Sequence, residues 1–129
     1  MSTSALADHG QQVLLVEDDV DIQEAMRDIL TEEGFAVRVA GNGREALEAL
    51  RGLPFRPRVI LLDLMMPVMD GWTFRAQQLA DPELRAIPVV VISADRGAQQ
   101  KAADMKVDAC LTKPVDLPQL LDTLAKLAA

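Results

Sequence analysis

Residues 58–63 read RVILLD, an apolar run that ends in an aspartate. A continuous apolar run of this length is typical of a strand buried on both faces, as in a parallel sheet. The same pattern occurs in QVLLV at residues 12–16 and in PVVVIS at residues 88–93. Residues 35–40 (FAVRVA) and 108–112 have strand composition as well. The chain therefore carries five predicted strands.

Helical periodicity fills the stretches between and after these strands. Apolar residues recur at spacings of three and four, which predicts amphipathic helices. The predicted helices cover residues 21–33, 44–51, 72–80, 96–105 and 117–127. Strict alternation of strand and helix favours a doubly wound α/β domain, with a five-stranded parallel sheet flanked by five helices.

Composition narrows the class of protein. The chain has 129 residues, enough for one domain, which we assign to residues 12–128 after a flexible tail at 1–11. A net charge of −7 argues against nucleic-acid binding. We find no signal peptide and no apolar run long enough to span a membrane, so we expect a cytoplasmic protein. A single cysteine, Cys110, excludes an internal disulfide.

Polar residues stand directly after four of the five predicted strands. Glu17 and Asp18 follow the first, Asp63 ends the third, Ser93 ends the fourth and Lys113 follows the fifth. The carboxyl ends of parallel strands meet at one edge of the sheet, where α/β proteins bind ligands. Carboxylates are ligands that Mg²⁺ prefers, and bound Mg²⁺ commonly also takes a phosphate oxygen. The pattern predicts a magnesium-dependent site for phosphoryl chemistry.

Five motifs in order, LLVEDD, AGNGREALEAL, VILLDLMMPVMDG, VVVISA and LTKP, resemble the receiver (REC) domains of two-component response regulators. The resemblance covers about residues 12–128. It implies a flavodoxin-like strand order 2-1-3-4-5 and a phosphorylation switch in a two-component system or phosphorelay. The implied donor is a sensor histidine kinase or a histidine phosphotransfer protein, and the implied readout is binding of an unknown downstream protein. Such a domain is not an enzyme in the usual sense, because it catalyses only its own phosphorylation and dephosphorylation.

The same resemblance implies a role for each polar residue. Asp63 would accept the phosphoryl group, Ser93 would be the switch hydroxyl, and Lys113, before a cis Pro114, would bind the phosphoryl oxygens. Mg²⁺, with Mn²⁺ as a possible substitute, would be held by Glu17, Asp18, Asp63 and the main-chain carbonyl of Met65.

Two positions depart from the family pattern. Cys110 stands where the family usually has an aromatic residue. That aromatic side chain moves inward when the switch hydroxyl moves toward the phosphoryl group. Met65 cannot orient an attacking water, although Asp95 faces the same space, so we expect slow-to-moderate loss of the phosphoryl group. Met65 also stands where an aspartyl-phosphate phosphatase of the haloacid dehalogenase type needs a second aspartate. The alternatives left open are a module cut from a hybrid kinase or larger regulator and a phosphorylation-independent binding module. A monomer or weak dimer fits any of them.

Overall fold

The computed structural model describes residues 12–52, 56–64, 66, 68–94, 97, 100 and 103–127. They form one five-stranded parallel sheet with the order β2-β1-β3-β4-β5, which confirms the predicted fold. Its strands are β1 (Gln12–Val16), β2 (Ala36–Ala40), β3 (Val59–Asp63), β4 (Val89–Ser93) and β5 (Ala109–Thr112).

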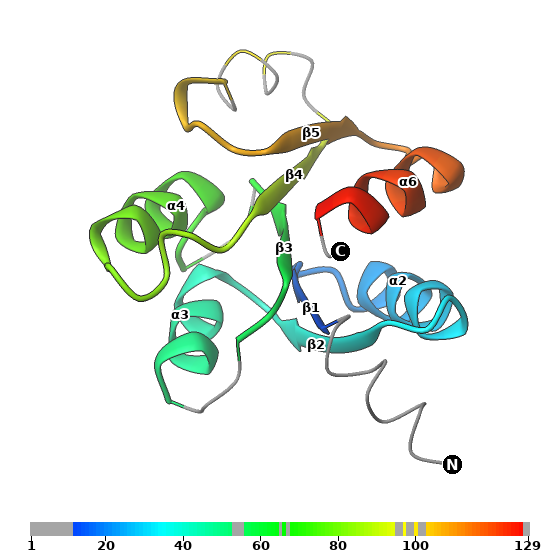
Figure 1. Ribbon diagram of the computed structural model, residues 1–129, viewed down its shortest axis with the longest axis horizontal. Helices are drawn as coiled ribbons and strands as arrows, with labels where there is room; N and C mark the ends of the chain where they lie inside the picture. The colour runs from blue at the N-terminus through cyan, green and yellow to red at the C-terminus, as the bar shows by residue number, and fades with distance from the viewer. Residues whose placement is uncertain are drawn as a thin grey trace.

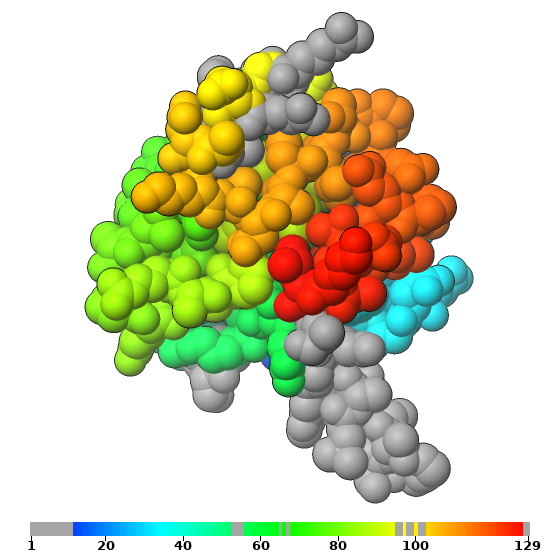
Figure 2. Space-filling model, turned by 45° about the horizontal axis from the view of Figure 1, so that its top comes forward, coloured from blue at the N-terminus to red at the C-terminus, as the bar shows by residue number. Residues whose placement is uncertain are grey.

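Helices cover both faces of this sheet. They are α2 (Val20–Glu32), α3 (Gly43–Gly52), α4 (Gly71–Ala80) and α6 (Leu117–Leu127). Figure 1 shows α2 and α6 on one face and α3 and α4 on the other. Figure 2 shows α6, in red, at the molecular surface beside the orange segment that follows β5. Within the described residues, no helix is both long and apolar enough to cross a membrane.

The described part of the chain contains four helices rather than the five predicted. The remaining predicted helix, residues 96–105, lies mostly outside the described residues. Gln100, Ala103 and Asp104, which are described, are helical.

The core consists of two apolar layers, one on each side of the sheet. Side chains alternate between the faces of a strand. Leu14 and Val16 of β1 therefore pack with α3 and α4, whereas Val13 and Leu15 pack with α2 and α6. The strands β3 and β4 are buried along their full length. This burial on both faces explains why they were recognisable as continuous apolar runs.

Local chemistry sets the helix ends. The Asp19 side chain accepts hydrogen bonds from the first turn of α2, and the Asp70 side chain does the same for α4. Such N-caps satisfy amide groups that have no partner inside the helix. After α2, Gly34 has φ = 95°, a conformation that ends helices and favours glycine. Asp19 and Asp70 thus have a structural role as helix caps.

Candidate functional site

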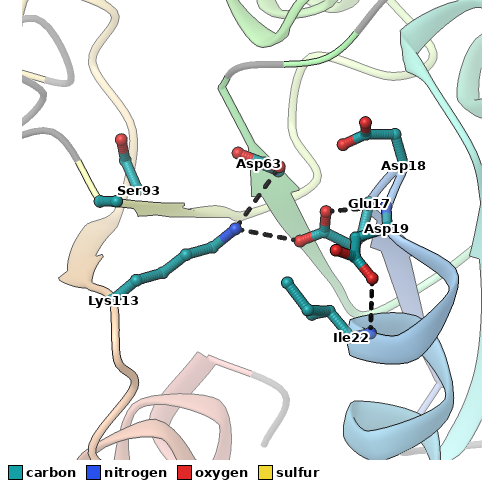
Figure 3. Close-up of a pocket in the computed structure, with 8 residues that line it drawn as sticks. Glu17, Asp18, Asp19, Ile22, Asp63, Ser93 and Lys113 are labelled. Atoms are coloured by element: carbon teal, nitrogen blue, oxygen red, sulfur yellow. Dashed lines mark hydrogen bonds and ion pairs between the residues drawn. The ribbon is translucent and has the colours of Figure 1, made fainter.

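Four strands bring the predicted residues to one edge of the sheet. Glu17 follows β1, Asp63 ends β3, Ser93 ends β4 and Lys113 follows β5. The β4–β5 register continues past the strand, because the Lys113 amide donates a hydrogen bond to the Ser93 carbonyl at 2.9 Å. Figure 3 shows Lys113 extending from β5 toward the carboxylates of Asp63 and Glu17, with Asp18 on the far side of them.

Three carboxylates form the centre of the site. One oxygen from each of Glu17, Asp18 and Asp63 lies within 4.8 Å of the others. Glu17 and Asp63 are buried, with 4% and 7% of their surface exposed, whereas Asp18 is exposed. Negative charges this close repel one another unless a cation offsets them. An all-oxygen donor set with one side open to solvent suits Mg²⁺, which keeps several waters.

The Lys113 ammonium supplies one positive charge. Its Nζ lies 3.2 Å from Glu17 Oε1 and 3.5 Å from Asp63 Oδ2. Burial by itself would lower the pKa of Lys113, but the nearby Asp63 and Glu17 carboxylates outweigh it and the pKa is raised. Lys113 therefore stays charged at neutral pH and bridges two of the three carboxylates.

Burial and neighbouring charges act on the Glu17 carboxylate. Burial is the main reason that its pKa rises to about 7, and the charge of Asp63 raises it further. The Asp19 amide and the Lys113 ammonium act in the opposite direction, because both favour the ionised form. One lysine alone is not enough to neutralise three carboxylates. The electrostatics therefore favour a further cation.

The cluster opens into a surface pocket of about 480 Å³. Its walls include all the described residues of the predicted set, and the described lining residues are Glu17, Asp18, Asp19, Ile22, Asp63, Ser93, Ala94 and Lys113. A space of this size next to buried Asp63 leaves room for a phosphoryl group and waters.

The structure brings together Glu17, Asp18, Asp63, Ser93 and Lys113. The Lys113–Pro114 peptide bond is cis, as the resemblance implies. Met65 and Asp95 lie outside the described residues, so their predicted roles stay predictions.

Sequence analysis missed Gln23. From the first turns of α2, its side-chain amide donates a hydrogen bond to the main-chain carbonyl of Glu17. The bond ties the acidic turn after β1 to the helix that follows it. The sequence did contain a signal for this bond, because Gln23 places an amide side chain one turn into a helix that begins directly after the acidic residues.

Comparison with known proteins gives one consistent result. The family model "Response regulator receiver domain" matches residues 13–125. The polar-differentiation response regulator DivK of Brucella anthropi is 29% identical, over 88% of this chain and 93% of its own length. The probable transcriptional regulator ycf29 of Pyropia yezoensis is 32% identical over 92% of this chain, but the match spans only 53% of that relative.

Solved structures agree with the sequence relatives. The receiver domain of sensor histidine kinase PA1611 from Pseudomonas aeruginosa, solved with a magnesium ion coordinated in its active-site cleft, has a TM-score of 0.83 and 26% identity. That match covers 92% of this chain and 98% of the other. The fold, the acidic pocket and the family match agree, and the chain belongs to the response regulator receiver domains of two-component signalling.

Proposed function

We propose that this receiver domain is phosphorylated on Asp63 and that the phosphoryl group changes its affinity for a partner protein. One observation carries the proposal. The Asp63 carboxylate lies in a pocket between two further carboxylates and the ammonium of Lys113, 3.5 Å away. A carboxylate placed between a cation site and a lysine is equipped to act as a nucleophile toward phosphorus.

The reaction transfers a phosphoryl group from a phosphohistidine. A carboxylate oxygen of Asp63 attacks phosphorus in line, the new O–P bond forms, and the P–N bond to the donor imidazole breaks. The imidazole leaves with the electron pair of that bond and takes up a proton. Lys113 can exchange its contact with Asp63 for one with the phosphoryl oxygens and so offset their charge.

The chemistry of the donor set fits Mg²⁺. Glu17, Asp18 and Asp63 would hold the ion together with the main-chain carbonyl of Met65, which lies outside the described residues. When bound, the ion supplies positive charge beside the phosphoryl oxygens. Mn²⁺ would substitute, because it also prefers carboxylate and carbonyl oxygens.

Ser93 and Lys113 would convert phosphorylation into a change of surface. A phosphoryl group adds a charge of about −1.5 to −2 at neutral pH. It would attract the Ser93 hydroxyl and the Lys113 ammonium, which stand at the ends of β4 and β5. Movement of these ends shifts an equilibrium between two conformations of the adjoining face. Cys110 of β5 is half-buried against the α3–α4 core layer and replaces the usual aromatic reporter.

The proposed partners follow from the family. The donor is a histidine kinase or a histidine phosphotransfer protein in the cytoplasm, and the readout is binding of a downstream protein rather than of nucleic acid. We propose a monomer or weak dimer with a receiver domain at residues 12–128 and a tail at 1–11. It acts as a single-domain regulator or as a module of a larger protein, and it catalyses only its own phosphorylation and dephosphorylation.

Labelling with acetyl phosphate and Mg²⁺ tests the proposal, with intact-mass spectrometry as the readout. We expect a single phosphoryl adduct on the wild type and none on Asp63→Asn. Asp28→Asn, at an exposed position of α2, is the matched control and should label like the wild type. An adduct that persists in Asp63→Asn would refute the assignment.

Partner capture with and without beryllofluoride, which mimics the bound phosphoryl group, separates the remaining alternatives. A partner retained only with beryllofluoride supports a phosphorylation switch. Equal capture in both states, together with no labelling, would instead indicate a phosphorylation-independent binding module. Turnover of a small phosphate ester would indicate a phosphatase.

A further inference from the structure

Helix α4 carries two buried polar residues that the site does not use. Arg75 is 5% exposed and Gln78 is fully buried. Arg75 contacts the turn that precedes β5, and Gln78 contacts the turn that precedes β4, at the amino ends of these strands. They therefore lie at the edge of the parallel sheet opposite the phosphorylation site. Figures 1 and 2 show α4, in green, beside the amber segment that leads into β5.

The two side chains form one hydrogen-bonded unit, which we call the α4 hub (Arg75 and Gln78). The Arg75 guanidinium donates to the Met105 carbonyl at 3.1 Å, to the Lys106 carbonyl at 2.7 Å and to Gln78 Oε1 at 2.7 Å. The Gln78 amide nitrogen donates to the main-chain carbonyls of two residues before β4, Leu84 and Ile87, at 3.0 Å each.

The surroundings explain how a buried cation is tolerated. Among the described residues, no carboxylate oxygen lies within 4.0 Å of the Arg75 guanidinium. Burial lowers the pKa of Arg75, and the more distant Asp108 raises it. The carbonyls of Met105 and Lys106 follow the helical residues Ala103 and Asp104 and lie at the negative end of that turn. A cation is stabilised at this end of a helix.

The amino ends of β4 and β5 are also bound to each other. The Asp108 amide donates to the Val89 carbonyl at 2.9 Å, and the Val89 amide donates to Asp108 Oδ2 at 2.8 Å. With the α4 hub, these bonds join the two strand starts and α4 into one block. Each of its buried polar groups would lose a partner if the block came apart, which makes opening costly.

We propose that Arg75 and Gln78 are positioning residues that hold the amino ends of β4 and β5 fixed while their carboxyl ends, at Ser93 and Lys113, respond to phosphorylation. The inference rests on the proposed function. β4 is five residues long, about 16 Å, so a strand fixed at one end can shift at the other by a small rotation. The conformational response to phosphorylation is then confined to the sheet edge that holds Ser93 and Lys113, which we call the site edge, and to the surface around it.

Hydrogen exchange of the full chain, with and without beryllofluoride and Mg²⁺, tests the proposal. In the wild type we expect slower exchange around Ser93 and Lys113 and no change in residues 81–88 and 103–108. The variant Arg75→Met with Gln78→Leu keeps apolar volume in the α4 hub but removes its donors. In this variant we expect beryllofluoride to change exchange at 103–108 by about tenfold, because the strand start is no longer held.

Two controls isolate the α4 hub. Arg44→Met with Gln119→Leu makes the same exchanges at exposed positions and should match the wild type. Arg75→Lys keeps a positive charge but lacks the planar fork of donors, so beryllofluoride should change exchange at 103–108 in the same direction but by less. This variant keeps the test possible if the double variant fails to fold. If Arg75 and Gln78 only stabilised the local structure, their replacement would speed exchange at 103–108 equally with and without beryllofluoride.

The outcomes separate this inference from the proposed function. If beryllofluoride leaves the wild-type site edge unchanged, the proposed function fails and the inference fails with it. If the site edge responds, the inference is overturned by a response at 103–108 in the wild type. It is equally overturned if neither the double variant nor Arg75→Lys shows a beryllofluoride-dependent change there.

Discussion

Replacing Gly71 by alanine tests how tightly α4 is set against the phosphorylation site. Gly71 is the buried first residue of α4, and its amide donates to the Leu64 carbonyl at 3.0 Å. A methyl group there would lie 2.8 Å from the Cα of Leu64 and 2.9 Å from the carbonyl oxygen of Asp63. These are backbone atoms, which cannot rotate away. Either the start of α4 or the end of β3 must move.

The magnitude follows from two opposing terms. Overpacking of this kind costs about 1–3 kcal/mol. Alanine recovers up to about 1 kcal/mol over glycine in a helix interior, and less at the first position. We therefore expect Gly71→Ala to lower the free energy of unfolding by about 1–2 kcal/mol. Displacement of Asp63 should also slow labelling by acetyl phosphate.

Urea denaturation measures the change, and Gly52→Ala is its matched control. Gly52 ends α3, and within the described part of the chain a methyl group added there meets no atom within 4 Å beyond its own helix and neighbouring residues. The control should be neutral or gain up to about 1 kcal/mol. The packing argument is wrong if Gly71→Ala is as stable as the wild type, or if the two variants shift stability by the same amount.

Three further predictions concern the helix cap and the cation site. Asp70→Ala should lower the free energy of unfolding by about 0.5–2 kcal/mol in urea denaturation, because the Thr73 amide loses its 2.9 Å acceptor; an unchanged midpoint would contradict this. Lys113→Met should slow phosphoryl labelling at least about tenfold, because no ammonium would offset the phosphoryl charge; a wild-type labelling rate would exclude that role. Mg²⁺ at 100 times its Kd should stabilise the protein by about 2.7 kcal/mol in thermal unfolding. EDTA should reverse this gain, and Asp18→Asn should reduce it.

The strands were predictable from the sequence because their burial is nearly complete. Each observed strand lies within its predicted range and starts no more than one residue later. The starts of the four described helices were predicted to within one residue, and at α2 and α4 the local caps Asp19 and Asp70 set them. The set of residues at the site was predictable for a topological reason. The end of each parallel strand must reach the same edge, whatever the details of packing.

Contacts that depend on the rotation of a helix could not be predicted in this way. Gln23 reaches the Glu17 carbonyl only because α2 turns that side of its surface toward the acidic turn. Strand periodicity says nothing about this angle. The bridge from Lys113 to both Glu17 and Asp63 likewise depends on side-chain reach, which sequence spacing does not fix.

The α4 hub is different, because the sequence contained a usable signal. The buried residues of α4 are Gly71, Phe74, Arg75 and Gln78, which follow the spacing i, i+3, i+4, i+7 of a core-facing stripe. Two long polar residues on such a stripe are either surface residues of a poorly formed helix or buried residues with complete sets of partners. The contacts of Arg75 and Gln78 show the second case, and their partners are main-chain carbonyls of turns, which no residue pattern reveals. A polar residue on the apolar stripe of a helix therefore predicts a buried junction between elements, and the fold must supply the identity of those elements.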